Sequence, residues 1–228
     1  MASFTEETLR TRTRRMADME NSTFITDAEL RDYINAAIAE LHDIVVEKYE
    51  DYYLKTSTSM DLSTGDTFDL PGDFYKALGV DLDVGGNTYS IANYSFQERN
   101  RHNTTAYSGD RLYAHTQYHI QGDSIKFIPT SSSGTALLYY VPVATQFSGP
   151  DFSNKEIKSI IPGYEDYVCV TATIACLMKE ESDTRIHMAR KAEIRARIES
   201  SAGKRNAGDS YAITDIDVGR GAGMDFHY

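Results

Sequence analysis

The sequence is poor in the residues and patterns that several classes of protein require. Among its 228 residues it has no tryptophan, five prolines and two cysteines, Cys169 and Cys176. On one helix these cysteines would lie roughly 10 Å apart along the axis, beyond disulfide reach, which predicts reduced and buried thiols. No apolar run approaches the roughly 20 residues of a membrane-spanning helix. The opening MASFTEETLRTRTRR lacks the apolar segment of a secretory signal, so we expect assembly in the cytoplasm.

Positive charge is scarce as well. The chain has 23 lysines and arginines against 34 aspartates and glutamates, a formal net charge of −11. Because the neutralisation of phosphates supplies most of the non-specific affinity for nucleic acids, this balance argues against a dedicated nucleic-acid binder. It is compatible with a surface past which DNA slides without sticking.

The patterns of catalytic, cofactor and metal sites are also missing. His115 and His119 would lie roughly 13 Å apart on one face of a strand, too far to share a metal ion. The glycine-rich run 219–223 is neither preceded by a strand nor followed by a helix, as a phosphate-binding loop would be. No nucleophile elbow or zincin helix occurs. We therefore expect a protein that is not an enzyme, with no catalytic residues, no cofactor, no metal and no membrane contact.

What the sequence does contain is, first, a long amphipathic helix over Thr26–Leu54. Apolar residues recur there at three- and four-residue steps, and neither glycine nor proline interrupts them. Thr26 and Glu29 have the spacing of a capping box, in which the hydroxyl and the carboxylate each accept a backbone N–H. This stretch predicts a helix with one buried face.

A shorter helix is predicted before it, over Phe4–Asp18. Thr5 can cap this helix, and its acidic start and basic end complement the helix dipole. Its basic residues are Arg10, Arg12, Arg14 and Arg15. They form either a DNA patch or, as we favour, partners of the acidic long helix or of an acidic neighbouring subunit.

The middle of the chain changes to a two-residue alternation, which is typical of strands. Val80, Leu82 and Val84 alternate with acids, and the Gly-Gly-Asn of 85–87 supplies a hairpin turn. A second hairpin is predicted over 118–127 around its Gly-Asp turn. A third apolar alternation consists of Leu137, Tyr139 and Val141, and it ends at Pro142. We expect a small antiparallel sheet or sandwich.

Helical periodicity returns in the last third of the chain. A first helix is apolar far around its circumference, with a stripe of Tyr164, Val168, Thr171, Ala172, Ala175 and Met178. A last helix, capped by Ser182-Asp183 and ending near Gly203, alternates Ile186, Ala189, Ile194 and Ile198 with basic residues. We therefore predict an α+β fold: a helical bundle or hub, an inserted small antiparallel β domain and an extended C-terminal tail. The predicted boundaries are 1–56 and 151–205 for the helices of the hub, 57–150 for the β domain and 206–228 for the tail.

The predicted tail has apolar residues at strand-like two-residue steps. They are Tyr211, Ile213, Ile216, Val218, Met224, Phe226 and Tyr228. Ordering each backbone residue costs about 1–2 kcal/mol, so a monomer gains little from fixing such a tail. It is either a frayed terminus or a segment that orders on a partner, most simply by strand addition.

The order of these segments resembles the head-to-tail adaptor, or connector, proteins of tailed bacteriophages. The similar stretches include ITDAELRDYINAAIAELHDIV, FDLPGDFYKALGVDL, YHIQGDSIKFIP, LLYYVPVA and GYEDYVCVTATIACLMKEESD. The resemblance implies a structural virion protein at the head-tail junction, which forms a ring of usually twelve copies. It implies a portal protein above and a tail or nozzle protein below, with viral dsDNA passing through the ring without specific binding. In such adaptors the C-terminal segment commonly reaches the portal.

A ring of this kind needs two different complementary surfaces on each subunit. The predicted pair is an acidic face of the long helix and the basic last helix. The acids are Glu40, Asp43, Glu47, Glu50 and Asp51, and the basic residues are Arg185, Arg190, Lys191, Arg195 and Arg197. These faces meet either between subunits or within one subunit. The alternatives to an adaptor are a tail completion or tail-tube-end protein, a carbohydrate-binding tail module using Tyr107, Tyr113 and Tyr118, and, least favoured, a cell-wall hydrolase.

Overall fold

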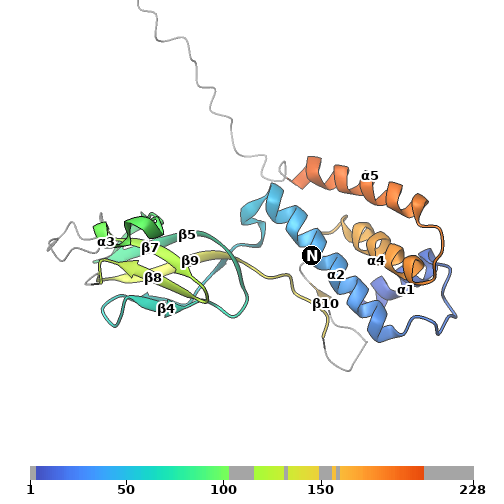
Figure 1. The fold of residues 1–228 in the computed structure, drawn as a ribbon, viewed down its shortest axis with the longest axis horizontal. Helices are drawn as coiled ribbons and strands as arrows, with labels where there is room; N and C mark the ends of the chain where they lie inside the picture. The colour runs from blue at the N-terminus through green and yellow to red at the C-terminus, as the bar shows by residue number, and fades with distance from the viewer. Residues whose placement is uncertain (1–3, 103–115, 131–132, 149–155, 158–159, 203–228) are drawn as a thin grey trace, which may run out of the picture.

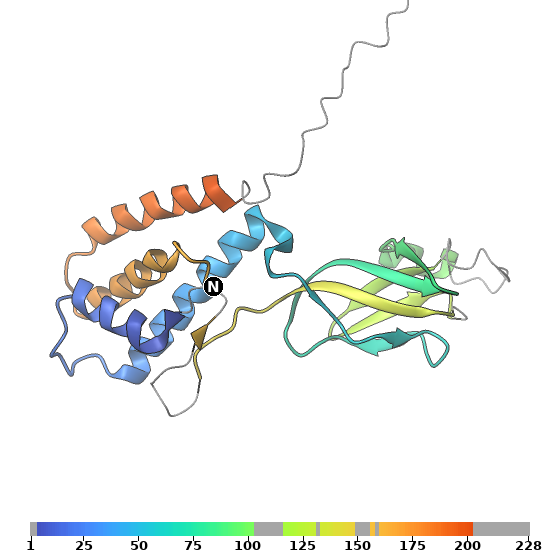
Figure 2. The same cartoon turned by 180° about the vertical axis from the view of Figure 1, so that it is seen from behind.

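The computed structural model describes residues 4–102, 116–130, 133–148, 156–157 and 160–202, and has a helical half beside a β half (Figure 1, Figure 2). The helical half contains α1 (Glu6–Met16), α2 (Asp27–Lys48), α4 (Glu165–Lys179) and α5 (Arg185–Ala202), with the short pair β1 (Phe4–Thr5) and β10 (Glu156–Ile157). The 3-10 turn η1 (Glu50–Tyr53) leads into the β half. The β half contains β2 (Lys55–Thr56), β3 (Met60–Asp61), β4 (Thr67–Asp69), β5 (Phe74–Val84), β6 (Asn87–Ile91), η2 (Phe96–Glu98), α3 (Arg99–His102), β7 (Gln117–Gln121), β8 (Ser124–Ile128) and β9 (Thr135–Pro142). The α+β class is confirmed.

The two N-terminal helices begin where the sequence predicts. The hydroxyl of Thr5 accepts the N–H of Thr8 at 3.2 Å, and the hydroxyl of Thr26 accepts the N–H of Glu29 at 3.3 Å. These bonds satisfy backbone donors that have no partner inside the helix. Both predicted caps are therefore confirmed.

The end of α2 differs from the prediction, because the helix stops at Lys48 and not at Leu54. At Tyr49 the backbone leaves the helical region, with φ −148° and ψ 81°, and η1 follows. The turn directs Tyr53 back onto the helical half, where its ring stacks on His42 with 4.7 Å between ring centroids. Tertiary packing of the tyrosines thus ends a helix that local periodicity would have continued.

α4 is the most buried helix of the described chain. Its interior residues include Tyr167, Val168, Cys169, Val170, Ala172, Ile174, Cys176 and Leu177. Contact with α1, α2 and α5 covers it from several sides, as the apolar pattern predicts. Both cysteines are free and buried, and burial raises the pKa of each thiol to about 11. Met178 was predicted in the buried stripe but is 61% exposed, because the last turn of α4 lies at the surface.

α5 is buried along only one part of its predicted stripe. Ile194 and Ile198 lie in the helical core, whereas Ala189 is exposed and Ile186 is 80% exposed. The predicted helix is present, but only two of the four apolar residues that alternate with its basic residues are buried. Only the C-terminal half of α5 packs closely on the helices beneath it, so its first turns present apolar and basic side chains to solvent.

The β half consists of two antiparallel sheets that enclose their own core. One sheet has the order β2-β9-β5-β6, with β3 also on β9, and the other has the order β4-β8-β7. The predicted hairpins are confirmed, with Leu82 opposite Tyr89 and Tyr118 opposite Phe127. Gly85 and Gly86 have φ values of +62° and +85°, which suits a tight hairpin turn between twisted strands.

β9 forms where predicted, but of the alternating residues Leu137, Tyr139 and Val141 only Val141 is buried. Ala136, Leu138 and Tyr140 point into the β core, whereas Leu137 and Tyr139 lie on the outer face. Pairing with β5 places Leu138 opposite the buried Val80 and Leu137 opposite Asp81. Because apolar residues occur on both faces of this strand, only the register with β5 decides which face is buried.

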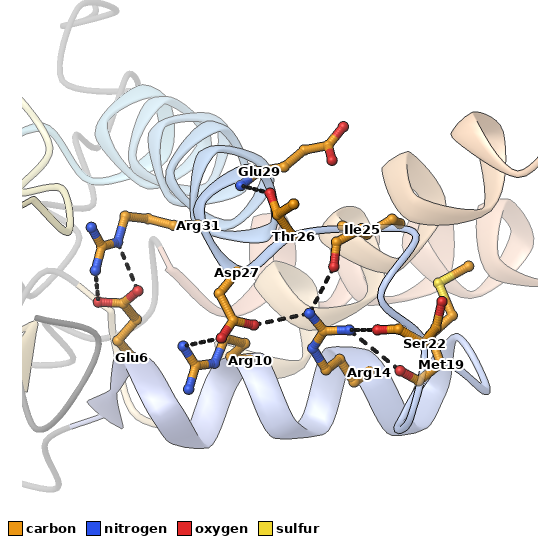
Figure 3. A network of polar contacts seen from close by, with 10 residues as sticks. All are labelled: Glu6, Arg10, Arg14, Met19, Ser22, Ile25, Thr26, Asp27, Glu29 and Arg31. Carbon is orange, nitrogen blue, oxygen red and sulfur yellow. Dashed lines mark hydrogen bonds and ion pairs between the residues drawn. The ribbon is translucent and has the colours of Figure 1, made fainter. Parts of the chain in front are cut away.

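Three of the four predicted arginines of α1 pair with acids of neighbouring helices, as we favoured. Arg10 and Arg14 both contact Asp27 of α2, at 3.2 Å and 2.9 Å (Figure 3). Arg12 pairs with Asp166 of α4, whereas Arg15 pairs with Glu20 in the loop after α1, at 3.1 Å. Arg14 also donates to the carbonyl oxygens of Met19, Ser22 and Ile25. One guanidinium therefore holds together the loop between α1 and α2.

A second contact in Figure 3 joins the same two helices inside the core. The carboxylate of Glu6 is fully buried and accepts two hydrogen bonds from the nearly buried Arg31, at 2.7 Å and 3.1 Å. Removal of one partner from such a pair leaves a charge in a site of low polarity. The pair therefore fixes how α1 lies on α2.

We predict that Glu6→Ala lowers the free energy of unfolding by about 3 kcal/mol, because it removes the carboxylate that faces the buried Arg31. Denaturant unfolding at pH 7 measures the loss. The control is Glu7→Ala, which changes the exposed neighbour in the same turn and should cost no more than about 0.5 kcal/mol. Equal effects of the two substitutions would contradict a stabilising role for the buried pair.

Candidate interaction surfaces

Four of the five acids predicted for the acidic face, Glu40, Asp43, Glu47 and Glu50, do not share one environment. Glu40 turns toward α5, where its carboxylate accepts hydrogen bonds from Lys191 at 2.8 Å and from the hydroxyl of Tyr167 at 2.6 Å. Asp43, Glu47 and Glu50 are exposed. Glu40 thus links α2 to α4 and α5 inside one chain, while the other three acids remain on the surface.

The protonation of Glu40 reflects this contact. Burial acts to raise the pKa of Glu40, but the hydrogen bonds from Lys191 and Tyr167 outweigh it and hold the pKa below its ordinary value. Burial, followed by the nearby Glu40, raises the pKa of Tyr167. At neutral pH the site therefore contains a carboxylate, an ammonium group and a neutral phenol.

Two of the exposed acids contact the β half. The hydroxyl of Tyr75 donates to Asp43 at 2.8 Å, and Lys76 pairs with Glu50 at 2.6 Å. Glu47 pairs only with its neighbour Lys48, at 2.8 Å. The acidic face of α2 therefore begins at the junction with β5 and continues along the exposed side of the helix.

The four predicted arginines of α5 also remain on the surface. Arg190 and Arg195 pair with Glu193 and Glu199 of the same helix, at 2.7 Å and 2.8 Å. Arg185 pairs with Asp183, and Arg197 donates to the carbonyl oxygen of Gly163 at 3.1 Å. None of these four described arginines is paired with α2; Lys191, from the same basic helix, makes that contact.

The outer side of α5 combines these arginines with small and apolar side chains. Ala189, Ala192 and Ala196 are exposed, and Ile186 and Met188 are exposed beside them. Long apolar side chains at the surface of a helix, next to small residues, allow close approach of another element. Sequence periodicity did not identify this surface, because the alternation of Ile186 and Ala189 with basic residues does not show which side of the helix is covered.

Other predicted residues divide between the described and the undescribed parts of the chain. The seven apolar residues of the tail, as well as Tyr107, Tyr113 and His115, lie outside the described residues. Tyr118 is only 7% exposed and belongs to the β core, so its ring cannot stack on a carbohydrate. His119 is half-buried on β7, where it contacts Asn93 at 3.2 Å.

A hollow of about 370 Å³ lies where α2 meets the β half. Its lining includes Ala39, His42, Asp43, Tyr75 and Val143. His42 is buried between the rings of Tyr53 and Tyr75, and burial lowers its pKa. In the described ranges no three His, Cys, Asp or Glu side chains gather closely enough to hold a metal ion.

In the described part of the chain, the distinctive charged groups lie on exposed surfaces and not in a pocket. This distribution is typical of structural proteins that bind other proteins. Residues 5–216 match the sequence profile of the family described as SU10 adaptor protein. Since the match covers most of the chain, the chain belongs to the SU10 adaptor protein family of phage head-to-tail adaptors. No curated protein matches the chain.

Family membership confirms the resemblance predicted from the order of the segments. The chain is a structural adaptor protein of a bacteriophage, with a place at the head-tail junction of the virion. An adaptor of this kind contacts portal and tail proteins in general. Within the part of the chain that the structure describes, none of the helices has both the length and the apolar character needed to cross a membrane.

We predict that Glu40→Gln lowers the free energy of unfolding by about 1 kcal/mol at pH 7, because the charge that faces Lys191 is lost. The folded pKa of Glu40 lies below its ordinary value, so its stabilisation is present above about pH 4.3 and is lost as the pH falls through the folded pKa. Denaturant unfolding at several pH values from 7 to 3 should therefore show that the difference in free energy of unfolding between wild type and variant disappears as the pH falls. Asp32→Asn, on the exposed side of α2, is the matched control and should give no such gap.

Proposed function

We propose that this adaptor forms a ring, most simply of twelve copies, between the portal and the tail or nozzle protein. In this ring the C-terminal tail docks on the portal, and the inner wall lines the DNA exit channel. The observation that carries the proposal is the charge of the helical half. Its exposed faces on α2 and α5 have opposite charge. Asp43, Glu47 and Glu50 form no ion pair with a described arginine of α5 in the same chain, and of these arginines Arg195 reaches Glu47 only as a more distant charge.

A closed ring requires each copy to join its neighbours through two unlike surfaces. The acidic α2 face and the basic α5 face meet this requirement, because α5 of one copy can lie against α2 of the next. Exposed Ile186 and Met188, with the alanines between the arginines, supply apolar area to the same contact. Charge then selects the register, and the apolar residues contribute most of the affinity.

The proposed division of the chain follows its two cores. One cluster of buried residues unites the helices from Leu9 to Ile198, and a separate cluster unites the strands from Met60 to Tyr140. This supports the proposed hub of 1–56 and 151–205 and the β domain of 57–150 in outline, with a tail from 206. At the boundaries, β2 (Lys55–Thr56) already pairs with β9, and Phe147 still packs with the helices. A formal net charge of −11 supports a channel wall that DNA passes without adhering.

The tail is the proposed contact with the portal. Its alternating apolar residues suit strand addition to a partner, which satisfies backbone hydrogen bonds and buries every second side chain. A ring presents many tails at once, so a weak single contact becomes tight through multivalency. The same tail could instead reach a tail-tube protein, and cross-linking identifies which neighbour it contacts.

We predict that a chain ending at residue 205 folds normally but loses binding to the portal. The described helical core ends with Ile198 and Ala202, so the truncation removes none of its buried residues. Circular dichroism measures the fold, and co-sedimentation measures the binding to the portal. A full-length chain with Met224, Phe226 and Tyr228 changed to serine is the control that separates loss of anchors from loss of length. Unchanged affinity of the truncated chain would refute the tail contact.

We predict that Glu47→Lys with Glu50→Lys weakens ring assembly at least about tenfold, because like charges then face each other between copies. Native mass spectrometry with and without portal measures the assembled fraction. Glu7→Lys with Glu20→Lys reverses two equally exposed acids on and near α1, away from the proposed interface. If the first variant forms rings at wild-type yield, the acidic face of α2 is only exposed to solvent and is not a subunit interface.

A further inference from the structure

The β half also carries two outer faces of opposite charge. Its two sheets enclose one core, to which Leu82 and Leu138 contribute from one sheet and Ile125 and Phe127 from the other. The outer faces of the two sheets therefore point away from each other. Successive side chains of a strand alternate between faces, so the register of the strands decides which charges lie outside.

The outer face of the β2-β9-β5-β6 sheet is acidic. Asp61 on β3 and Asp83 on β5 both lie opposite Thr135 of β9, so these residues form one row across the sheet. Asp81 lies in the next row, opposite Leu137. These carboxylates accept hydrogen bonds from Ser63, Gly86 and Ser90, and none of the three is in an ion pair with a described residue. We call this surface the acidic sheet face: Asp61, Asp81, Asp83, Leu137 and Tyr139.

The outer face of the β4-β8-β7 sheet is basic and aromatic. His119 on β7 lies directly opposite Lys126 on β8. The ring of Phe96 lies 6.1 Å from that of His119, and the guanidinium of Arg99 lies over Phe96 at 4.3 Å from its centroid. Phe96 is 52% exposed. We call this surface the basic sheet face: Phe96, Arg99, His119 and Lys126.

The cations of the basic sheet face are not neutralised inside the described chain. Arg99 donates to the carbonyl oxygen of Phe96, and His119 contacts Asn93, but neither these two nor Lys126 is paired with a described carboxylate. Two acids lie close to this face. The carboxylate of Asp66 accepts the hydroxyl of Thr67, and Asp69 of β4 lies opposite Ser124 of β8 on the same side of the sheet. In a chain of net charge −11, unpaired cations around an exposed phenylalanine form an unusual surface.

We propose that the basic sheet face of one copy docks on the acidic sheet face of the next copy, so that the β halves form a second interface in the ring. This inference rests on the proposed ring and adds a contact that the helices do not make. Two unlike faces on opposite sides of one sandwich repeat from copy to copy, as a cyclic assembly requires. Cations meet carboxylates, and Phe96 meets the half-buried Leu137 and Tyr139.

A second copy is the occupant that explains both faces together. A polyanion such as DNA or an acidic polysaccharide would use the basic sheet face but leave the acidic one without a partner. Such a ligand would also approach a chain whose overall charge repels it. Complementary charge across a protein interface chiefly sets register and excludes wrong partners, which a ring of identical subunits needs.

Charge reversal tests the pairing in the full-length chain. The basic-face variant carries Arg99→Glu and Lys126→Glu, and the acidic-face variant carries Asp81→Lys and Asp83→Lys. Each alone places like charges across every β contact. Each should raise the subunit concentration for half-assembly at least about tenfold under the conditions in which wild type forms rings. Asp123→Lys, at the exposed turn between β7 and β8, is the control and should assemble as wild type does.

Mixing the two variants distinguishes a direct contact from a loss of folding. In an alternating ring every reversed basic face meets a reversed acidic face, and every native face meets a native one. Equal amounts of the two variants should therefore recover assembly, as should one chain that carries all four substitutions. Mass photometry measures the rings, and thermal unfolding reports the fold of each variant.

A cysteine pair gives a second measurement that does not depend on charge. Lys126→Cys with Asp83→Cys in one chain should yield a ladder of disulfide-linked copies on mild oxidation of the assembled ring. The native cysteines are buried and do not compete. Each cysteine alone should give no ladder beyond a dimer, because one thiol cannot extend a chain of links.

The outcomes separate this inference from the ring itself. Failure of wild type to form rings, with or without portal, overturns both. Wild-type rings together with unaffected variants, no recovery on mixing and no ladder overturn the β contact alone. If only the basic-face variant loses an interaction, with portal, tail protein or a short DNA duplex, then that face has another occupant and the inference is wrong.

Discussion

The burial of α4 is the constraint on which the helical half depends. A helix that is apolar around most of its circumference must be covered on several sides, and α1, α2 and α5 supply that cover. The polar contacts at its N-terminal end follow from this arrangement. Arg12 reaches Asp166 from α1, and Glu40 joins Tyr167 and Lys191 across α2, α4 and α5.

The covering helices each bury one side only, so their other sides remain available to partners. On α2 that side carries Asp43 and Glu47, followed by Glu50 at the start of η1. On α5 it carries arginines with exposed Ile186. Contacts from Tyr75 and Lys76 attach the β half beside the acidic side of α2. The position of the sheets is thereby tied to the surface through which we propose that the ring closes.

In the ring that we propose, function depends on which surfaces meet, and an acidic chain must hold its copies together. The distribution of charge addresses this problem in both halves, since each half has one acidic and one basic exposed face. Cyclic assembly uses such unlike pairs, because each copy offers one face to either neighbour. In the proposed ring each copy keeps its net charge of −11, which favours passage of DNA over its retention.

The sequence by itself determined the starts of α1 and α2, the two hairpins, the burial of Cys169 and Cys176, and the order of segments that identifies the family. These features depend on caps, turns and periodicity, which act over a few residues. Only the tertiary structure decided the end of α2 at Lys48, the buried parity of β9 and the exposure of Ile186. It also decided that Glu40 meets Lys191. Each of these depends on residues distant in the chain, whose packing overrides or selects among locally equivalent arrangements.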